Sequence, residues 1–152
     1  MGRNTLVYSN YGNTLTKGFE QCRLVAYWDA FGKVWTIGWG HTGGVYEGMT
    51  CTQAQADAWL ASDEQSAVNT VNDEVEVILT QHEFDALVDF VFNDGGGNFR
   101  SSTMLTMLNA GNYAGAADQL LLWDHSGGQV LAGLLKRRTE ERNEFNTGDI
   151  NG

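Results

Sequence analysis

The spacing of apolar side chains changes twice along the chain and predicts three successive kinds of structure. Over residues 13–24 the apolar side chains recur at near-helical intervals, which predicts a helix that follows a polar, loosely held lead-in. Over residues 25–44 Tyr, Trp, Val, Ile and Thr are crowded between glycines, which predicts a small antiparallel sheet that turns near residues 31–33. From Thr52 onward the helical spacing returns and continues almost to the C-terminus.

The helical region opens with an N-terminal capping signal. Thr52 is followed three residues later by Gln55, which matches a capping box, and the spacing after it predicts one long helix over residues 52–72. Glycine-rich segments divide the remainder and predict shorter helices over residues 81–93, 102–109, 112–123 and 130–145. These elements predict a single α+β domain over residues 1–152, in which the long helix joins a sheet-bearing lobe (approximately 13–60) to a helical lobe (73–152).

Composition and charge exclude several classes of protein. The chain has 152 residues, of which 42% are apolar, and its net charge is −10 at pH 7. That size and apolar content suit one globular domain with a real core. The acidic charge repels a phosphate backbone, so we expect no nucleic-acid binding. No apolar run approaches a membrane span and the N-terminus shows no targeting signal, so we expect no membrane insertion.

The cysteines and histidines show no metal-binding pattern. Cys22 and Cys51 lack the short spacing of a metal or redox motif. Two buried free thiols are the favoured interpretation, although a disulfide between them stays open. His82 and His125 have no ligand pattern around them, so we expect no metal site.

Two carboxylates near the first helix are candidates for acid and base chemistry. Glu20 falls late on the predicted helix, and Asp29 falls at the start of the predicted sheet, so the two can face one cleft from opposite sides. Cleavage of a glycosidic bond needs one protonated and one ionised carboxyl group. An apolar helix favours the protonated form of Glu20, and a turn-rich strand favours the ionised form of Asp29. Spacing alone, however, favours two carboxylates with no joint role.

The predicted sheet is unusually aromatic. Trp28, Trp35 and Trp39 accompany Tyr27 and Tyr46 in this short segment. Aromatic faces stack on sugar rings, but they also fill thin cores. Taken alone, the pattern favours core packing.

From residue 16 to residue 148 the chain resembles the phage-type lysozymes, or endolysins. The resemblance rests on motifs in colinear order: Phe19-Glu20, Ala26-Tyr27-x-Asp29, Thr36-Ile37-Gly38-Trp39-Gly40-His41-Thr42, Phe84-Asp85-Ala86-Leu87, Phe92-Asn93-x-Gly95, Ser101-Ser102-Thr103, Leu108-Asn109-Ala110-Gly111, Trp123, Gly133-Leu134, Arg137-Arg138 and Phe145-x-Thr147-Gly148. It implies a lysozyme-like fold with a cleft between the two lobes.

The resemblance also implies roles for individual residues. Glu20 matches the general acid, Asp29 the second catalytic carboxylate, and Thr36 the threonine that helps to place the attacking water. Two departures bear on these roles. Gln21 stands where the family usually has glycine, and the interval from Asp29 to Thr36 is one residue longer than in many relatives, which puts the placement of Thr36 in question.

Further positions are implied to support the substrate or the fold. Phe92 and Asn93 match sugar-contacting positions in the cleft, with a plain helix C-cap as the alternative for both. Thr42 and Ser102 match substrate contacts more loosely. His41 and Asp63 match an ion pair between the lobes, with a solvated Asp63 as the alternative. Arg137 matches the arginine that pairs with the catalytic glutamate, with Arg138 as the second choice. Sequence spacing by itself predicts an i,i+4 contact from Arg137 to Glu141, or a solvated basic turn.

The resemblance implies that the protein acts as an endolysin. Such an enzyme hydrolyses the β-1,4 bond between N-acetylmuramic acid and N-acetylglucosamine in bacterial peptidoglycan and lyses the host cell. It would act as a monomer without a cofactor, be made in the host cytoplasm and reach the wall through a separate pore protein. A lytic transglycosylase, for which one glutamate suffices, and a non-catalytic glycan-binding module are the alternatives.

Overall fold

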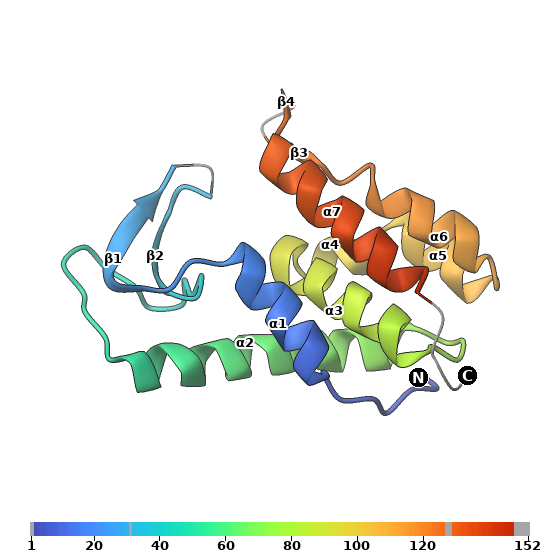
Figure 1. Ribbon diagram of the computed structural model, residues 1–152, viewed down its shortest axis with the longest axis horizontal. Helices are drawn as coiled ribbons and strands as arrows, with labels where there is room; N and C mark the ends of the chain where they lie inside the picture. The colour runs from blue at the N-terminus through green and yellow to red at the C-terminus, as the bar shows by residue number, and fades with distance from the viewer. Residues whose placement is uncertain (1, 31, 127–128, 148–152) are drawn as a thin grey trace.

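The two lobes of the molecule lie toward opposite ends of one long helix, α2 (Gln53–Glu74), as Figure 1 shows. The computed structural model describes residues 2–30, 32–126 and 129–147. Thr52 caps α2 with the expected capping box, because its hydroxyl accepts a hydrogen bond from the Gln55 N–H at 3.1 Å and the Gln55 side chain accepts one from the Thr52 N–H at 3.0 Å. The long connecting helix is therefore confirmed.

The small lobe is built on an antiparallel pair of strands, β1 (Arg23–Asp29) and β2 (Val34–Gly38). Ile37 is fully buried and anchors β2. Gly38 has a φ of 64°, and a side chain there would press on Ala56 of α2, so glycine permits both the turn and the close approach to the helix. The small antiparallel sheet is confirmed, although its second strand ends at Gly38 rather than near residue 44.

The first helix, α1 (Asn10–Phe19), begins and ends earlier than the apolar spacing predicts. Ser9 caps it by accepting a hydrogen bond from the Gly12 N–H. It ends because Glu20 has an extended backbone (φ −95°, ψ 139°) and the chain then enters β1. The prediction that the first helix extends through Cys22 to Leu24 is therefore wrong. The segment that follows Glu20 pairs instead with β2 and with residues 49–51, and this pairing decides its conformation.

The lead-in before α1 is not loose. Asn4 is buried, with 7% of its surface exposed, and it ties the N-terminal segment to the stretch that follows α2. Its amide donates to the Val77 carbonyl at 2.8 Å, and its carbonyl oxygen accepts from the Leu79 N–H at 3.0 Å. A buried polar side chain with both partners satisfied holds this segment in place.

Five helices make up the helical lobe: α3 (Gln81–Asp94), α4 (Gly96–Arg100), α5 (Thr103–Asn109), α6 (Tyr113–Leu120) and α7 (Ala132–Phe145). Helix α3 is central, because it packs against α1, α2 and α7 and is buried from Phe84 to Val91. A second, two-residue pair, β3 (His125–Ser126) and β4 (Gln129–Val130), precedes α7.

The sequence predicted most of these helices but not all their ends. Helix α4 was not expected, because its glycines indicated only a loop, and α6 ends at Leu120 instead of residue 123. Among the predicted features, the turn residue Phe31, the separators Gly127 and Gly128, and Gly148 lie outside the described residues.

Candidate active site

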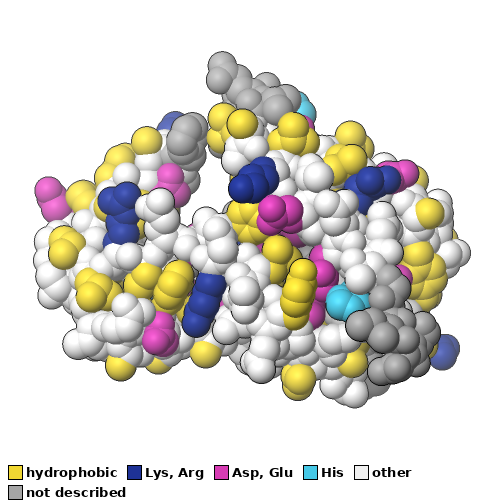
Figure 2. Space-filling model, in the orientation of Figure 1, with side chains coloured by type: hydrophobic (Ala, Val, Ile, Leu, Met, Phe, Trp, Pro, Cys, Tyr) yellow, Lys and Arg dark blue, Asp and Glu magenta, His cyan; other side chains and the backbone are white. Residues whose placement is uncertain are grey.

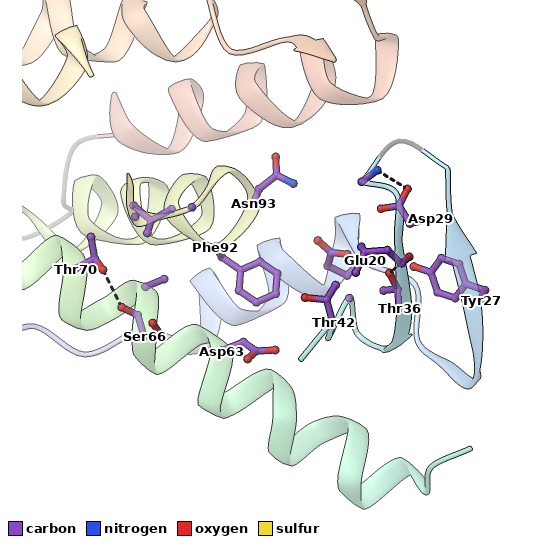
Figure 3. Close-up of a pocket in the computed structure, with 17 residues that line it drawn as sticks. Glu20, Tyr27, Asp29, Thr36, Thr42, Asp63, Ser66, Thr70, Phe92 and Asn93 are labelled. Atoms are coloured by element: carbon purple, nitrogen blue, oxygen red, sulfur yellow. Dashed lines mark hydrogen bonds between the residues drawn. The ribbon is translucent and has the colours of Figure 1, made fainter. Parts of the chain in front are cut away.

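A cleft of about 520 Å³ lies between the lobes. Figure 3 shows side chains reaching into it from both sides: Glu20 and Thr36 from the small lobe, Phe92 from the helical lobe, and Asp63 from α2. Of the residues that the resemblance assigns to catalysis or substrate binding, the cleft is lined by Glu20, Asp29, Thr36, Thr42, Phe92 and Asn93.

Glu20 lies at the end of α1, where its backbone N–H still donates to the Thr16 carbonyl. Its Oε1 accepts a hydrogen bond from Arg137 Nη1 at 2.8 Å, and its side chain is 19% exposed. Gly40 has a φ of 93°, and a Cβ there would lie 3.0 Å from Glu20 Oε2, so a glycine keeps this carboxylate accessible. The structure thus contains the pair of Glu20 and Arg137 that the resemblance implied.

Asp29 and Thr36 lie on neighbouring strands at the same side of the cleft. Asp29 Oδ1 accepts from the Gly32 N–H at 3.2 Å, which fixes the carboxylate at the turn after β1. Thr36 is buried and donates to the Val34 carbonyl at 3.3 Å. Tyr27 lies opposite Thr36 in the sheet, and its pKa is raised by burial and by the charges of Glu20 and Asp29. Both carboxylates thus act electrostatically on one phenol in the cleft.

The two departures from the family pattern leave the cleft open. Gln21 is exposed and its side chain accepts a hydrogen bond from Arg23 at 3.3 Å, and it does not line the cleft. Residues 30–33 separate β1 from β2, and Lys33 among them has a left-handed φ of 53°. Thr36 still faces the cleft.

The opposite wall comes from the end of α3. Phe92 and Asn93 line the cleft, and Asn93 lies inside the helix, because the C-cap is Gly95. The alternative of Asn93 as a helix cap is therefore wrong. Its Oδ1 is buried without a hydrogen-bond partner among the described residues, so it has an unused acceptor beside the cleft.

Ser102 does not belong to this site. Its side chain is buried, its hydroxyl donates to the Phe99 carbonyl at 2.7 Å, and it accepts from the Leu105 N–H at 3.0 Å. It is the N-cap of α5. The expected substrate contact of Ser102 is corrected to a helix-capping role.

His41 and Asp63 come together across the junction between the lobes. His41 Nδ1 and Asp63 Oδ2 are 2.9 Å apart, and the imidazole stacks on Trp59 with ring centroids 4.7 Å apart. Trp59 and Asp63 lie one turn apart on α2, so one helix face contacts both the ring plane and the Nδ1 edge of His41. The structure thus contains the contact that the resemblance implied, and Asp63 is 37% exposed.

A buried network of ion pairs joins Arg137 and Arg138 to carboxylates near the cleft. Arg137 binds Asp89 through two hydrogen bonds, Nε to Oδ2 at 2.9 Å and Nη2 to Oδ1 at 2.8 Å. Arg138 binds Glu141, with Nε 2.6 Å from Oε1, and it also pairs with Asp94. Arg137 and Arg138 are 4% and 0% exposed, so the alternative of a solvated basic turn is wrong.

The two buried acids of this network have opposite protonation. Burial alone would raise the pKa of Asp89, but hydrogen bonds from Glu141 and Arg137 hold it at about 2. Burial, the hydrogen bond to Asp89 and its charge raise the pKa of Glu141 well above the usual value. The protonated form of Glu141 is thus favoured beside ionised Asp89. Asp89 was missed in the sequence, although a carboxylate inside the apolar run of α3 signals a buried partner.

Glu64 is a buried acid of α2. Burial raises its pKa to about 7, against the opposing charge of Lys17. The protonated form is favoured in the folded state, so its stabilising contribution is complete below pH 4.5 and is lost as pH rises through 7.

Replacing Glu64 with Gln should remove this pH dependence, because the amide stays neutral. Between pH 5 and 8 the free energy of unfolding of the parent should fall relative to Glu64→Gln by about 2 kcal/mol. Chemical denaturation of both proteins at the two pH values measures the difference. A constant difference would mean that Glu64 does not change its charge in this range.

The aromatic residues of the small lobe do not form its core. Trp28 is 51% exposed and Tyr46 is 63% exposed, and the fully buried residue of the sheet is Ile37. Trp28 and Trp35 instead pack edge to face on the sheet. Tyr27 is the aromatic residue of β1 that lines the cleft, so the interpretation of these residues as core packing is wrong for the strongly exposed ones.

The cysteines, the metal-binding potential and the surface charge complete the description of the molecule. Cys22 and Cys51 are free thiols but are partly exposed, so their expected burial is wrong. Within the described ranges, no cluster of three His, Cys, Asp or Glu side chains could hold a metal ion, and no helix is both long and apolar enough to cross a membrane. Figure 2 shows Lys and Arg scattered singly over the described part of this face, with no continuous basic patch.

Comparisons with known proteins agree on one family. The family described as phage lysozyme matches residues 17–141. The endolysin of Bacillus phage B103 is 43% identical over 143 residues, which cover 93% of this chain and 54% of that protein. The endolysin of Acyrthosiphon pisum secondary endosymbiont phage 1 is 39% identical, with 90% and 96% of the two chains covered. The muramidase domain of SpmX from Asticcacaulis excentricus superimposes with a TM-score of 0.84 at 39% identity, over 93% of this chain and 99% of that domain. The chain thus spans about half the length of the Bacillus phage relative that it matches.

Proposed function

The chain belongs to the phage lysozyme family, and from this we propose that it hydrolyses the glycan strands of bacterial peptidoglycan. The bond cleaved is the β-1,4 bond between N-acetylmuramic acid and N-acetylglucosamine. The observation that carries the proposal is the cleft in which Glu20, Asp29 and Thr36 face the same space, with Glu20 held by Arg137.

In the proposed reaction Glu20 acts as the general acid. Its proton passes to the glycosidic oxygen as the bond from that oxygen to the anomeric carbon breaks. A water held by Asp29 and Thr36 adds its oxygen to the anomeric carbon and gives its proton to Asp29. Glu20 ends as a carboxylate beside Arg137, Asp29 ends protonated, and exchange with solvent restores both groups.

The remaining cleft residues suit a sugar polymer. Phe92 offers an aromatic surface to a pyranose ring, and Asn93 lines the cleft beside it. Thr42 and Ser66 line the same cleft and contribute hydroxyl groups. No metal or organic cofactor is needed, because two carboxylates and water complete the proton transfers.

The clearest test of activity is the clearing of a purified cell-wall suspension. Loss of turbidity on addition of the protein supports hydrolysis of the wall. A protein that binds the walls but leaves their turbidity unchanged would instead be a glycan-binding module.

Because the substrate lies outside the inner membrane, we also propose that the chain is made in the host cytoplasm and reaches the wall through a separate pore protein.

We predict inversion at the anomeric carbon, because the water placed by Asp29 and Thr36 attacks from the face opposite Glu20. Inverting enzymes place their carboxyl groups roughly 6.5–9.5 Å apart, and retaining enzymes about 5–5.5 Å apart. Proton NMR of the first reducing sugar, recorded before mutarotation, should show the α-anomer. A β-anomer would mean that Asp29 attacks the anomeric carbon directly and that Thr36 does not place the water.

A further inference from the structure

Arg137 lies between two carboxylates that belong to different parts of the molecule. Its Nη1 donates to Glu20 at 2.8 Å, while its Nε and Nη2 donate to the two oxygens of Asp89 at 2.9 and 2.8 Å. The guanidinium is 4% exposed and also lies over the ring of Phe19, 5.2 Å from its centroid. The bidentate contact to Asp89 fixes the plane of the guanidinium and therefore the position of the donor that meets Glu20.

Asp89 is itself held on every side. It is completely buried on α3, and Thr16 of α1 donates to its Oδ1 at 2.8 Å. The Thr16 hydroxyl lies 2.6 Å from the Tyr8 hydroxyl, so the contact continues into the N-terminal segment. Glu141 supplies a further hydrogen bond from α7. With these donors around it, Asp89 has a fixed negative charge.

The charge of Arg137 is a problem for a general acid. A guanidinium at 2.8 Å stabilises the carboxylate form of Glu20, whereas proton donation requires the protonated form. An opposite charge bound to the same guanidinium reduces this effect, because the pair is then nearly neutral as a unit. Asp89 is in the position to provide that charge.

We infer that Asp89 is a positioning residue for Glu20 that acts through Arg137: it orients the guanidinium that binds Glu20 and offsets the charge of that guanidinium, so that Glu20 can serve as a proton donor. The inference rests on the proposed role of Glu20 as general acid. Asp89 does not line the cleft, so it is not placed to act on the substrate directly.

Other titratable groups face this unit from each neighbouring element. They are Tyr8 from the N-terminal segment, Glu64 from α2, Asp94 from α3, and Arg138 and Glu141 from α7; Tyr27 and Asp29 of β1 share the cleft with Glu20. Glu64 has a pKa of about 7, so its own titration must be separated from that of Glu20. The Glu64→Gln protein is therefore the background for the test.

The experiment compares pH profiles of kcat/KM on solubilised peptidoglycan for the background protein and for Asp89→Asn. Removal of the Asp89 charge should move the alkaline limb of the profile about one unit to lower pH. At pH 7 kcat should fall about tenfold, while KM stays within about twofold, because substrate contacts are unchanged. At a pH below the limb, most of the lost kcat should return.

Two further variants separate the inference from a loss of folding. Asp85→Asn changes another buried acid one turn earlier on α3, which binds Ser9 and Gln81, and it should leave the limb in place. The double variant Asp89→Asn with Arg137→Met removes both charges together, which avoids an unpaired buried charge, and its limb should return to that of the background protein. If Asp89→Asn lowers kcat by the same factor at every pH, or if the double variant keeps the displaced limb, the role of Asp89 is structural only. A background protein that does not cleave peptidoglycan would instead contradict the proposed function.

Discussion

Replacing Glu20 with Gln should lower the rate of peptidoglycan hydrolysis at least about 100-fold while the protein keeps its fold. Gln has the shape of Glu and can still accept the hydrogen bond from Arg137, but it has no proton of sufficient acidity to give to the leaving oxygen. Clearing of cell walls measures the activity, and circular dichroism with thermal unfolding measures the fold.

A matched control is available on the same lobe. Glu47 is exposed and does not line the cleft, so Glu47→Gln makes the same chemical change away from the site and should retain the parent rate. If Glu20→Gln clears walls within a few-fold of the parent, Glu20 is not the acid. Equal losses in both variants would point to a general effect of charge on wall binding.

The largest effect on stability is expected at Arg138. Arg138→Met should lower the free energy of unfolding by about 3 kcal/mol, because the fully buried Glu141 loses its hydrogen-bond donor and Asp94 loses its ion-pair partner. Arg138 is fully buried, it binds Glu141 and Asp94, and its guanidinium lies over the ring of Phe90 at 5.0 Å. Urea denaturation gives the difference directly.

The control for Arg138 lies one turn further along α7. Arg142 pairs with Asp118 at 2.7 Å, but the two side chains are 37% and 64% exposed. Arg142→Met should therefore cost less than about 1 kcal/mol. Similar costs for the two variants would contradict the view that burial, and not the presence of an ion pair, sets the energetic weight of this network.

Short sequence motifs predicted those helix ends that are fixed by hydrogen bonds between residues close together in the sequence. The capping box at Thr52 marks the start of α2 because both of its hydrogen bonds join residues within one turn. The end of α1 could not be predicted in the same way. Glu20 leaves the helix because the following residues pair with β2, and such pairing joins positions that are distant in the sequence.

The candidate site shows the same division. Resemblance to a family indicated Glu20, Asp29 and Thr36, and the fold brings all three to one cleft. Asp89 matched no family motif, and its partners come from α1 and α7, so only the folded structure brings them together. Ser102 was misassigned because the contact rested only on a loose match to the family, whereas its hydroxyl caps α5.

Analysis of the cleavage products tests the proposed function most directly. Purified peptidoglycan is digested with the protein, the products are reduced with borohydride, and their ends are identified by mass spectrometry, with the Glu20→Gln protein in parallel. The proposed hydrolysis predicts new reducing ends on N-acetylmuramic acid, which appear only with the parent protein. Ends that carry 1,6-anhydro-muramic acid would indicate a transglycosylase, reducing ends on N-acetylglucosamine would indicate cleavage of the other glycan bond, and either result would contradict the account.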